Sequence, residues 1–244
     1  MTGRLLTPWR STTAAGLIAL ALGAGTAMGV AVPGPAAPTP STAWIAAPLS
    51  PVVARAAPKA SARVVWRVPL VGRFGGDRTH LLVTRVAIRK GVRWVEVLLP
   101  KRPNGSRGWV LQGRMELTST SIRLKIDVSD RRLSVFRKNR RIMYVPVAVG
   151  KDATPTPTGP LFAIAETLRG IPGGFLGTYI LPLTGFSETL NEFAGGDGRV
   201  AIHGTSLPAL IGTQASHGCV RMFNGDVTRL ARLARPGTPL VITP

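Results

Sequence analysis

Three residues in one short segment have the side chains needed for nucleophilic catalysis. Segment 200–222 contains the only cysteine of the 244-residue chain, Cys219, and two of its three histidines, His203 and His217. A thiol becomes a strong nucleophile only as the thiolate, and a neighbouring imidazole commonly removes its proton. The pattern therefore predicts a cysteine nucleophile with a histidine base.

Two other interpretations of these residues are weaker. Cysteine and histidine bind zinc, but a zinc site usually needs three or four protein ligands, and the sequence has neither a second cysteine nor an H-E-x-x-H helix. We therefore predict no metal and no cofactor. A buried structural thiol is the remaining alternative. Two histidines and the adjacent Gly204 and Gly218, which allow close backbone approach, argue against it.

The charge composition predicts an anionic partner. The chain carries 31 lysines and arginines against 11 aspartates and glutamates, a formal net charge of +20. Such a field attracts polyanions, among them anionic cell-wall polymers, lipids and nucleic acids. Nucleic-acid binding is not predicted, because the sequence shows no recognition helix or aromatic RNA platform and starts with an export-type segment. A genome whose base composition favours arginine, alanine and proline codons would explain the charge equally well.

The N-terminal 60 residues predict action outside the cytoplasm. Residues 1–32 combine Arg4 and Arg10 with a dense apolar run over 17–22, which is typical of a signal peptide or an N-terminal membrane anchor. Cleavage would release the protein, whereas retention would leave the N-terminus contacting or spanning the membrane. Residues 33–60 are rich in proline and alanine, which predicts a semi-stiff linker and not part of a core.

A small β-domain is expected over 61–117. Short apolar runs such as 94–98 are separated there by turn residues such as Asn104-Gly105. The runs around Trp94 and Trp109 resemble bacterial SH3-like domains of exported wall proteins. The resemblance implies a wall-binding or substrate-positioning module, and the alternative is a packing domain whose tryptophans lie in its core.

The last half of the chain is also predicted to be mainly β. Alternation of apolar and polar residues over 122–128 predicts a strand with one buried face. The glycine-rich stretch 170–198 predicts a mobile flap over a cleft or a long loop. A helix is expected over 226–234, with Asn224 or Asp226 available as its N-cap.

These motifs together resemble the L,D-transpeptidase catalytic domain family (YkuD-like). Its hallmark is a His-Gly pair, about a dozen residues, and then Ser/Thr-His-Gly-Cys; here 204–215 separate His203 from Ser216-His217-Gly218-Cys219. The resemblance implies a catalytic domain over 121–244. It also implies an L,D-transpeptidase-type β-sandwich with a short helix after the cysteine motif, here preceded by the small SH3-like β-barrel at 61–117.

The resemblance further implies a role for each residue of the motif. Cys219 would be the nucleophile, His203 the base and later the acid, and the Gly204 carbonyl the group that orients the imidazole. From the residues alone His217 competes with His203 as the base, because side chains two apart in an extended segment point the same way. The implied pocket, oxyanion and substrate contacts are Ser216, His217, Gly218, Arg221 and Tyr179.

The implied activity is cross-linking of peptidoglycan stem peptides. Cys219 would attack a tetrapeptide stem, release the terminal D-alanine and hold the remainder as a thioester, which an amine of a neighbouring stem would resolve. Acylation by carbapenems is also implied. Two alternatives stay open: a hydrolase on the same scaffold, in which water resolves the thioester, and a non-catalytic cell-wall-binding protein.

Overall fold

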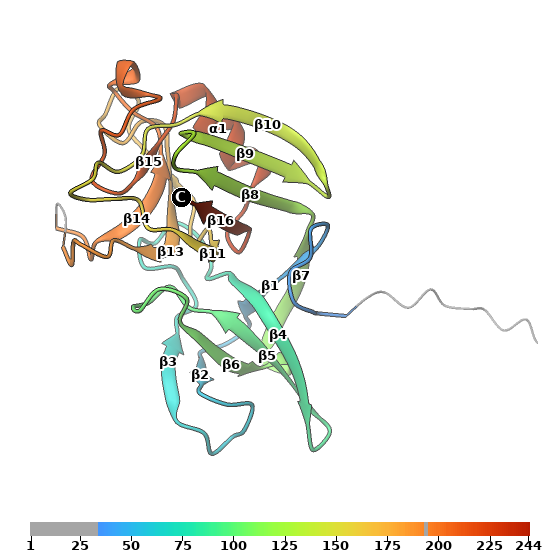
Figure 1. Cartoon of the computed structure of the whole chain (residues 1–244). Coiled ribbons are helices and arrows are strands. Elements are labelled where there is room, and N and C mark those ends of the chain that lie inside the picture. The colour runs from blue at the N-terminus through green and yellow to red at the C-terminus, as the bar shows by residue number, and fades with distance from the viewer. Residues whose placement is uncertain (1–33, 193–194) are drawn as a thin grey trace, which may run out of the picture. The chain divides into compact units, whose positions relative to one another are not determined.

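β-Strands make up most of the regular structure, as predicted. The computed structural model describes residues 34–192 and 195–244, and in these ranges the only α-helix is α1 (Asn224–Leu233) (Figure 1). The predicted signal peptide or membrane anchor at 1–32 lies outside the described residues. Within the described ranges, no helix is long and apolar enough to cross a membrane.

The upstream region is a seven-stranded antiparallel sheet in the order β3-β2-β6-β5-β4-β1-β7. Its strands are β1 (Ala43–Pro48), β2 (Val52–Arg55), β3 (Val64–Val68), β4 (Leu81–Arg89), β5 (Val92–Leu98), β6 (Arg107–Leu111) and β7 (Met115–Thr120). Valines such as Val83, Val95 and Val110 form its core. Trp94 and Trp109 are buried as well, which agrees with the packing interpretation of the tryptophans.

The predicted linker at 33–60 is wrong over 43–55. There the chain forms β1 and β2, and β1 pairs with both β4 and β7. Ile45 is completely buried. Pro48 ends β1 and Pro51 precedes β2, so these prolines sit at strand ends, where no ladder hydrogen bond is lost. The upstream β region therefore starts at Ala43, not at residue 61.

The second half of the chain forms two further sheets. The five-stranded sheet has the order β10-β9-β8-β16-β11, and the four-stranded sheet the order β12-β13-β14-β15 (Figure 1). The strands are β8 (Ile122–Asp127), β9 (Arg132–Arg137), β10 (Arg140–Pro146), β11 (Gly159–Ala163), β12 (Leu168–Arg169), β13 (Tyr179–Phe186), β14 (Arg199–His203), β15 (Val220–Arg221) and β16 (Pro239–Thr243).

One apolar core joins these two sheets and α1. Ile122, Leu124 and Ile126 of β8 are buried, as their alternation predicted, and they belong to the same cluster as Ile202 of β14 and Leu230 of α1. Alternate residues of each strand thus face this core. The alternate residues of the four-stranded sheet, such as His203 in β14 and Arg221 in β15, lie on its opposite face, away from this core.

The glycine-rich stretch 170–198 is not one long flap or loop. Residues 179–186 form β13, which pairs with both β12 and β14, and Leu181 and Leu183 are completely buried. The apolar residues between the glycines find strand partners at 168–169 and 199–203, and the composition of the stretch alone does not reveal them. Residues 170–178 contain only turns and bends.

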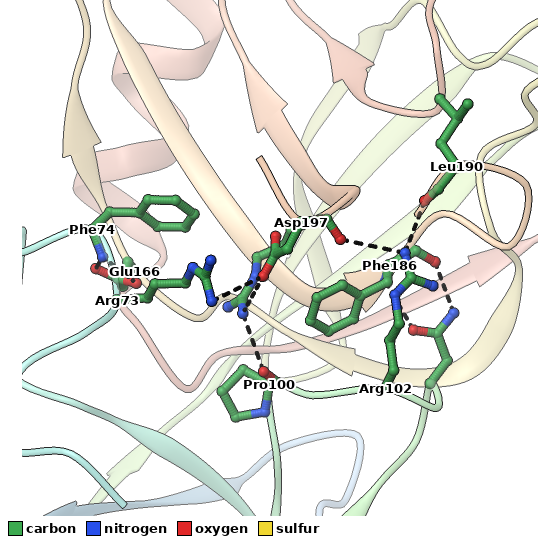
Figure 2. Close-up of polar contacts among 10 residues, drawn as sticks. Arg73, Phe74, Pro100, Arg102, Glu166, Phe186, Leu190 and Asp197 are labelled. Atoms are coloured by element: carbon green, nitrogen blue, oxygen red, sulfur yellow. Dashed lines mark hydrogen bonds and ion pairs between the residues drawn. The ribbon is translucent and has the colours of Figure 1, made fainter. Parts of the chain in front are cut away.

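Loops of the upstream sheet hold the hairpin formed by β13 and β14. The Arg102 guanidinium donates a hydrogen bond to the carbonyl oxygen of Leu190 at 2.8 Å, as Figure 2 shows, and another to that of Ser187 at 2.7 Å. Asn104 makes a two-way pair with the backbone of Phe186, at 2.8 and 2.9 Å. Arg199, at the start of β14, donates to the Pro100 carbonyl (Figure 2). The hairpin is therefore anchored on a second part of the chain.

Candidate active site

The strand register places the predicted base beside the short strand that follows the predicted nucleophile. β14 and β15 run parallel, with Ile202 opposite Val220 and His203 opposite Arg221. Side chains alternate along each strand, so His203 shares one face with Arg221. Cys219 directly precedes β15 and hydrogen-bonds to the backbone of Ala201, two residues before His203 in β14. Ile202 and Val220 point the other way, into the core. Two segments sixteen positions apart in the chain thus contribute to one site.

His203 is held as a neutral imidazole with a defined tautomer. Its side chain is 2% exposed, and Nδ1 lies 2.6 Å from the carbonyl oxygen of Gly204. Because a carbonyl only accepts, Nδ1 carries the hydrogen and Nε2 keeps a lone pair. Burial, with a smaller contribution from the Arg221 charge, lowers the pKa of His203 to about 4, although the hydrogen bond to Gly204 opposes this. At neutral pH the ring is therefore a base.

Cys219 is held as a thiol. The residue is partly exposed, but its sulfur is packed closely enough that burial raises the pKa of the thiol above its ordinary value of 9.0. A hydrogen bond with the backbone of Ala201 and the charge of Arg221 both act in the opposite direction. The resting pair therefore consists of a neutral thiol and a neutral imidazole, and not of a preformed ion pair.

Ser216 and Gly218 shape the turn that carries Cys219. The Ser216 hydroxyl donates to the Cys219 carbonyl at 2.5 Å and accepts from the Gly218 N–H at 3.1 Å. Gly218 has φ +112°, a conformation that residues with a Cβ rarely adopt. His217, between them, is exposed, whereas His203 is buried.

The threonine-rich segment 149–156 hydrogen-bonds to the backbone of this turn at Ser216. The Ser216 N–H donates to the Val149 carbonyl at 2.9 Å, and the Thr154 hydroxyl donates to the Ser216 carbonyl at 3.4 Å. The Gly150 N–H in turn donates to the Thr156 hydroxyl at 2.8 Å. The connector 154–159 therefore helps to position the cysteine motif as well as linking two strands.

Arg221 places a buried positive charge beside the histidine. It is 5% exposed, and its guanidinium carbon lies 4.9 Å from the ring centroid of Phe175. The same ring is 6.4 Å from the ring centroid of His203. Phe175 comes from the loop 170–178 and is half-exposed, so this loop covers one side of the histidine and arginine. The sequence did not single out Phe175 as a site residue.

Comparison with known proteins identifies the family. Residues 121–242, half of the chain, match the model of the L,D-transpeptidase catalytic domain (YkuD). The chain belongs to this family. The YkuD proteins of Bacillus licheniformis and Bacillus subtilis, which carry L,D-transpeptidase names, are 34% and 33% identical to it. The matches cover 50% and 54% of this chain, and 66% and 73% of the two relatives.

A solved structure is similar over a longer part of the chain. L,D-transpeptidase 3 from Mycobacterium tuberculosis aligns with 81% of this chain and 99% of its own, at 13% identity and a TM-score of 0.44. The family match begins at residue 121, so the strands of the upstream sheet lie before the L,D-transpeptidase domain. The SH3-like nature of that upstream region stays a prediction.

In this L,D-transpeptidase domain Tyr179 contacts the site through its backbone. Ile180 is opposite His203, so alternation places the Tyr179 side chain on the other face, where it packs against the core. Its carbonyl oxygen accepts a hydrogen bond from the Gly204 N–H at 3.1 Å. The Tyr179 side chain therefore lies on the face away from His203, and the prediction that Tyr179 contributes to substrate or oxyanion binding stays a prediction.

Asn224 is the site residue whose position the sequence did not reveal. Its side-chain oxygen accepts hydrogen bonds from the N–H groups of Thr178 and Thr205, both at 3.2 Å, and its side-chain nitrogen donates to the Thr205 carbonyl at 3.0 Å. The predicted capping roles of Asn224 and Asp226 are wrong: Phe223 occupies the N-cap, with no side-chain cap. A polar residue at a helix start signals a cap, and no local pattern indicates partners 19 and 46 residues away.

Proposed function

We propose that this chain is a cysteine-dependent L,D-transpeptidase that cross-links peptidoglycan stem peptides outside the cytoplasmic membrane. One observation carries the proposal: Cys219 hydrogen-bonds to the backbone of Ala201 in β14, two residues before a histidine whose Nδ1–H is held by the Gly204 carbonyl. The lone pair on Nε2 is then available to take the thiol proton. Family membership supports peptidoglycan stems as the substrate class.

Acylation starts from the neutral pair. His203 Nε2 accepts the proton of Cys219 as the sulfur attacks the carbonyl carbon of the third stem residue, in the amide that joins it to D-alanine. The Gly204 carbonyl, already bonded to Nδ1–H, stabilises the imidazolium that forms. The tetrahedral intermediate collapses as the amide C–N bond breaks, and His203 returns the proton to the leaving nitrogen of D-alanine. A thioester at Cys219 remains.

Deacylation transfers the stem to an amine. The side-chain amine of a neighbouring stem attacks the thioester carbon, His203 accepts a proton from this amine, and the sulfur leaves and is reprotonated. The backbone N–H of Cys219 is the candidate for stabilising the oxyanion, because the Ser216 and Gly218 N–H groups of the same turn already donate to the Val149 carbonyl and the Ser216 hydroxyl. Arg221 adds a fixed positive charge at the same face, which suits a donor that carries a carboxylate.

Intact-protein mass spectrometry tests this proposal. Incubation with a tetrapeptide donor is expected to add the mass of the donor less D-alanine, and Cys219→Ala should add nothing. A carbapenem serves as a second electrophilic probe. Addition of an amine acceptor should then convert the acyl-enzyme into cross-linked product, whereas free tripeptide as the sole product would indicate hydrolysis. Wild-type protein that reacts with neither probe would contradict the proposal.

The two histidines are expected to differ sharply. His203→Ala should slow acylation by about 10²- to 10⁴-fold, the usual contribution of a general base. His217→Ala should change the rate much less, because His217 is exposed, whereas His203 is buried and bonded to the Gly204 carbonyl. Single-turnover acylation of both variants, with unfolding curves to check that they fold, decides the matter. Equal losses would show that His203 is not the specific base.

A further inference from the structure

Asn224 links the start of α1 to two loops at the site. Its side-chain amide uses both polar atoms: Oδ1 accepts from the N–H groups of Thr178 and Thr205, and Nδ2 donates to the Thr205 carbonyl. The Thr205 contacts form a two-way pair with that residue's own backbone. A side chain bonded in this way has little rotational freedom left, so it can hold the backbone it contacts.

The contact with Thr205 reaches His203 through one peptide group. The Thr205 N–H and the Gly204 C=O belong to the same planar unit, so the direction of the N–H determines that of the carbonyl. Asn224 Oδ1 accepts from this N–H at 3.2 Å, and the Gly204 oxygen lies 2.6 Å from His203 Nδ1. Asn224, the Gly204–Thr205 peptide and the imidazole thus form a continuous chain of hydrogen bonds, in which each bond polarises the next.

Two glycines leave the room that the Asn224 amide occupies. A Cβ at Gly204 or at Gly177 would overlap Asn224 Oδ1, closer than any real contact allows. The Asn224 amide can therefore take its present position only because both residues are glycines. Gly177 also has φ +65°, in the left-handed region that favours glycine.

We propose that Asn224 is a positioning residue for the catalytic base. It holds the Gly204–Thr205 peptide so that the Gly204 carbonyl keeps the hydrogen of His203 on Nδ1 and leaves Nε2 free to receive the proton of Cys219. The inference rests on the proposed role of His203 as the base. Asn224 does not touch the reacting atoms, and its effect is exerted through the histidine.

Three variants separate positioning from mere loop packing. Asn224→Ala removes all three hydrogen bonds, and Asn224→Asp keeps the acceptor atoms but loses the donor to the Thr205 carbonyl. Thr228→Val is the matched control on the same helix. It removes a hydroxyl that bonds the Asn224 carbonyl at 2.8 Å and Thr178 at 3.0 Å, and it leaves the Asn224 side chain in place.

The decisive measurement is the state of the His203 ring by nitrogen NMR of labelled protein, with His203→Gln used to assign the signal among the three histidines. In Asn224→Ala we expect the Nδ1–H tautomer to be lost or mixed. The acylation rate constant should fall by about 10-fold or more, within the limit of about 10²- to 10⁴-fold set by the base itself, with little change in KM for the donor. Asn224→Asp should fall between Asn224→Ala and wild type.

Two results would overturn the proposal. One is an unchanged Nδ1–H tautomer in Asn224→Ala, whatever happens to the rate. The other is an equal loss of acylation in Thr228→Val, since that would indicate general loosening of the loops. Failure of the proposed function is seen separately: wild-type protein that forms no acyl-enzyme refutes the transpeptidase, whereas the tautomer measurement still decides whether Asn224 orients His203.

Discussion

At the scale of the residue, the site holds two groups that are both uncharged at rest. Burial lowers the pKa of His203 and raises that of Cys219, and the Arg221 charge lowers both. In the mechanism that we propose, nucleophilicity therefore arises during the reaction, as the proton moves from sulfur to nitrogen, and not from a thiolate already present at rest. This arrangement protects the only thiol of the chain from side reactions until a substrate is in place.

The histidine should make folding stability depend on pH. Its folded pKa of about 4 lies below the ordinary 6.5, so between these values the unfolded chain binds a proton that the folded chain does not. The contribution of the neutral His203 to the free energy of unfolding is fully present above pH 6.5. It is lost as the pH falls from 6.5 toward 4. Between pH 7.5 and 5 we expect a loss on the order of 2 kcal/mol from this group.

Urea unfolding of wild type and His203→Gln at the two pH values measures this effect. The variant lacks the titration, so its stability should fall by less over the same interval. The carboxylates act on both proteins alike and cancel in the comparison. The same pH dependence in wild type and variant would mean that His203 titrates normally in the folded protein.

At the scale of the element, the turn that carries Cys219 depends on backbone geometry. Gly218 has φ +112°, and a Cβ there would make only ordinary van der Waals contacts, the nearest with the Pro155 carbonyl oxygen at 3.5 Å. The difficulty for a larger residue is therefore conformational and not steric crowding. The turn can keep its present shape only while residue 218 tolerates a positive φ.

Gly218→Ala is expected to destabilise the protein by about 1–3 kcal/mol, the usual cost of a strained backbone conformation. It should also lower the acylation rate, since the Cys219 backbone follows directly. Gly225→Ala is the matched control: Gly225 lies in α1 with open space where a Cβ would project, and alanine should stabilise a helix by about 0.5–1 kcal/mol. Changes of opposite sign in the free energy of urea unfolding of the two variants would confirm this. A Gly218→Ala variant as stable as wild type would contradict it.

At the scale of the whole molecule, the upstream sheet supports the hairpin that ends in His203. Arg102 and Asn104 bond the backbone at 186–190, where β13 ends. Arg102 also lies over the Phe186 ring, at 5.0 Å. In the L,D-transpeptidase domain, the buried Glu166 carboxylate accepts a hydrogen bond at 3.0 Å from the N–H of Phe74, which lies in a loop of the upstream sheet (Figure 2). The upstream sheet is thus part of the framework of the site, whatever else it binds.

Arg102→Ala should lower the free energy of unfolding by about 1.5–3 kcal/mol, because two partly buried carbonyl groups would lose a charged donor. Arg93→Ala removes an exposed arginine of the same sheet and should stay within about 0.5 kcal/mol of wild type. Urea unfolding of the two variants gives the comparison. If Arg102→Ala were as stable as Arg93→Ala, the contacts in Figure 2 would not anchor the hairpin.

The amino-acid sequence by itself determined the family and the residues on which the proposed chemistry depends. The spacing of His203 and Cys219 within one motif identified the L,D-transpeptidase domain, and the alternation at 122–126 identified a strand of its core. Both are local signals, because residue type and short-range periodicity carry them. The mainly β fold follows from the same kind of pattern, repeated along the chain.

Tertiary structure alone decided the parts that depend on distant partners. β1 and β13 are strands because β4, β7, β12 and β14 offer them hydrogen bonds and burial, although their composition suggested a linker and a loop. Parity within β13 turned Tyr179 away from His203. The contacts of Asn224 exist only because loops 19 and 46 residues away meet at one helix start. Contacts between segments so far apart depend on the packing of the whole chain, so no local sequence pattern predicts them.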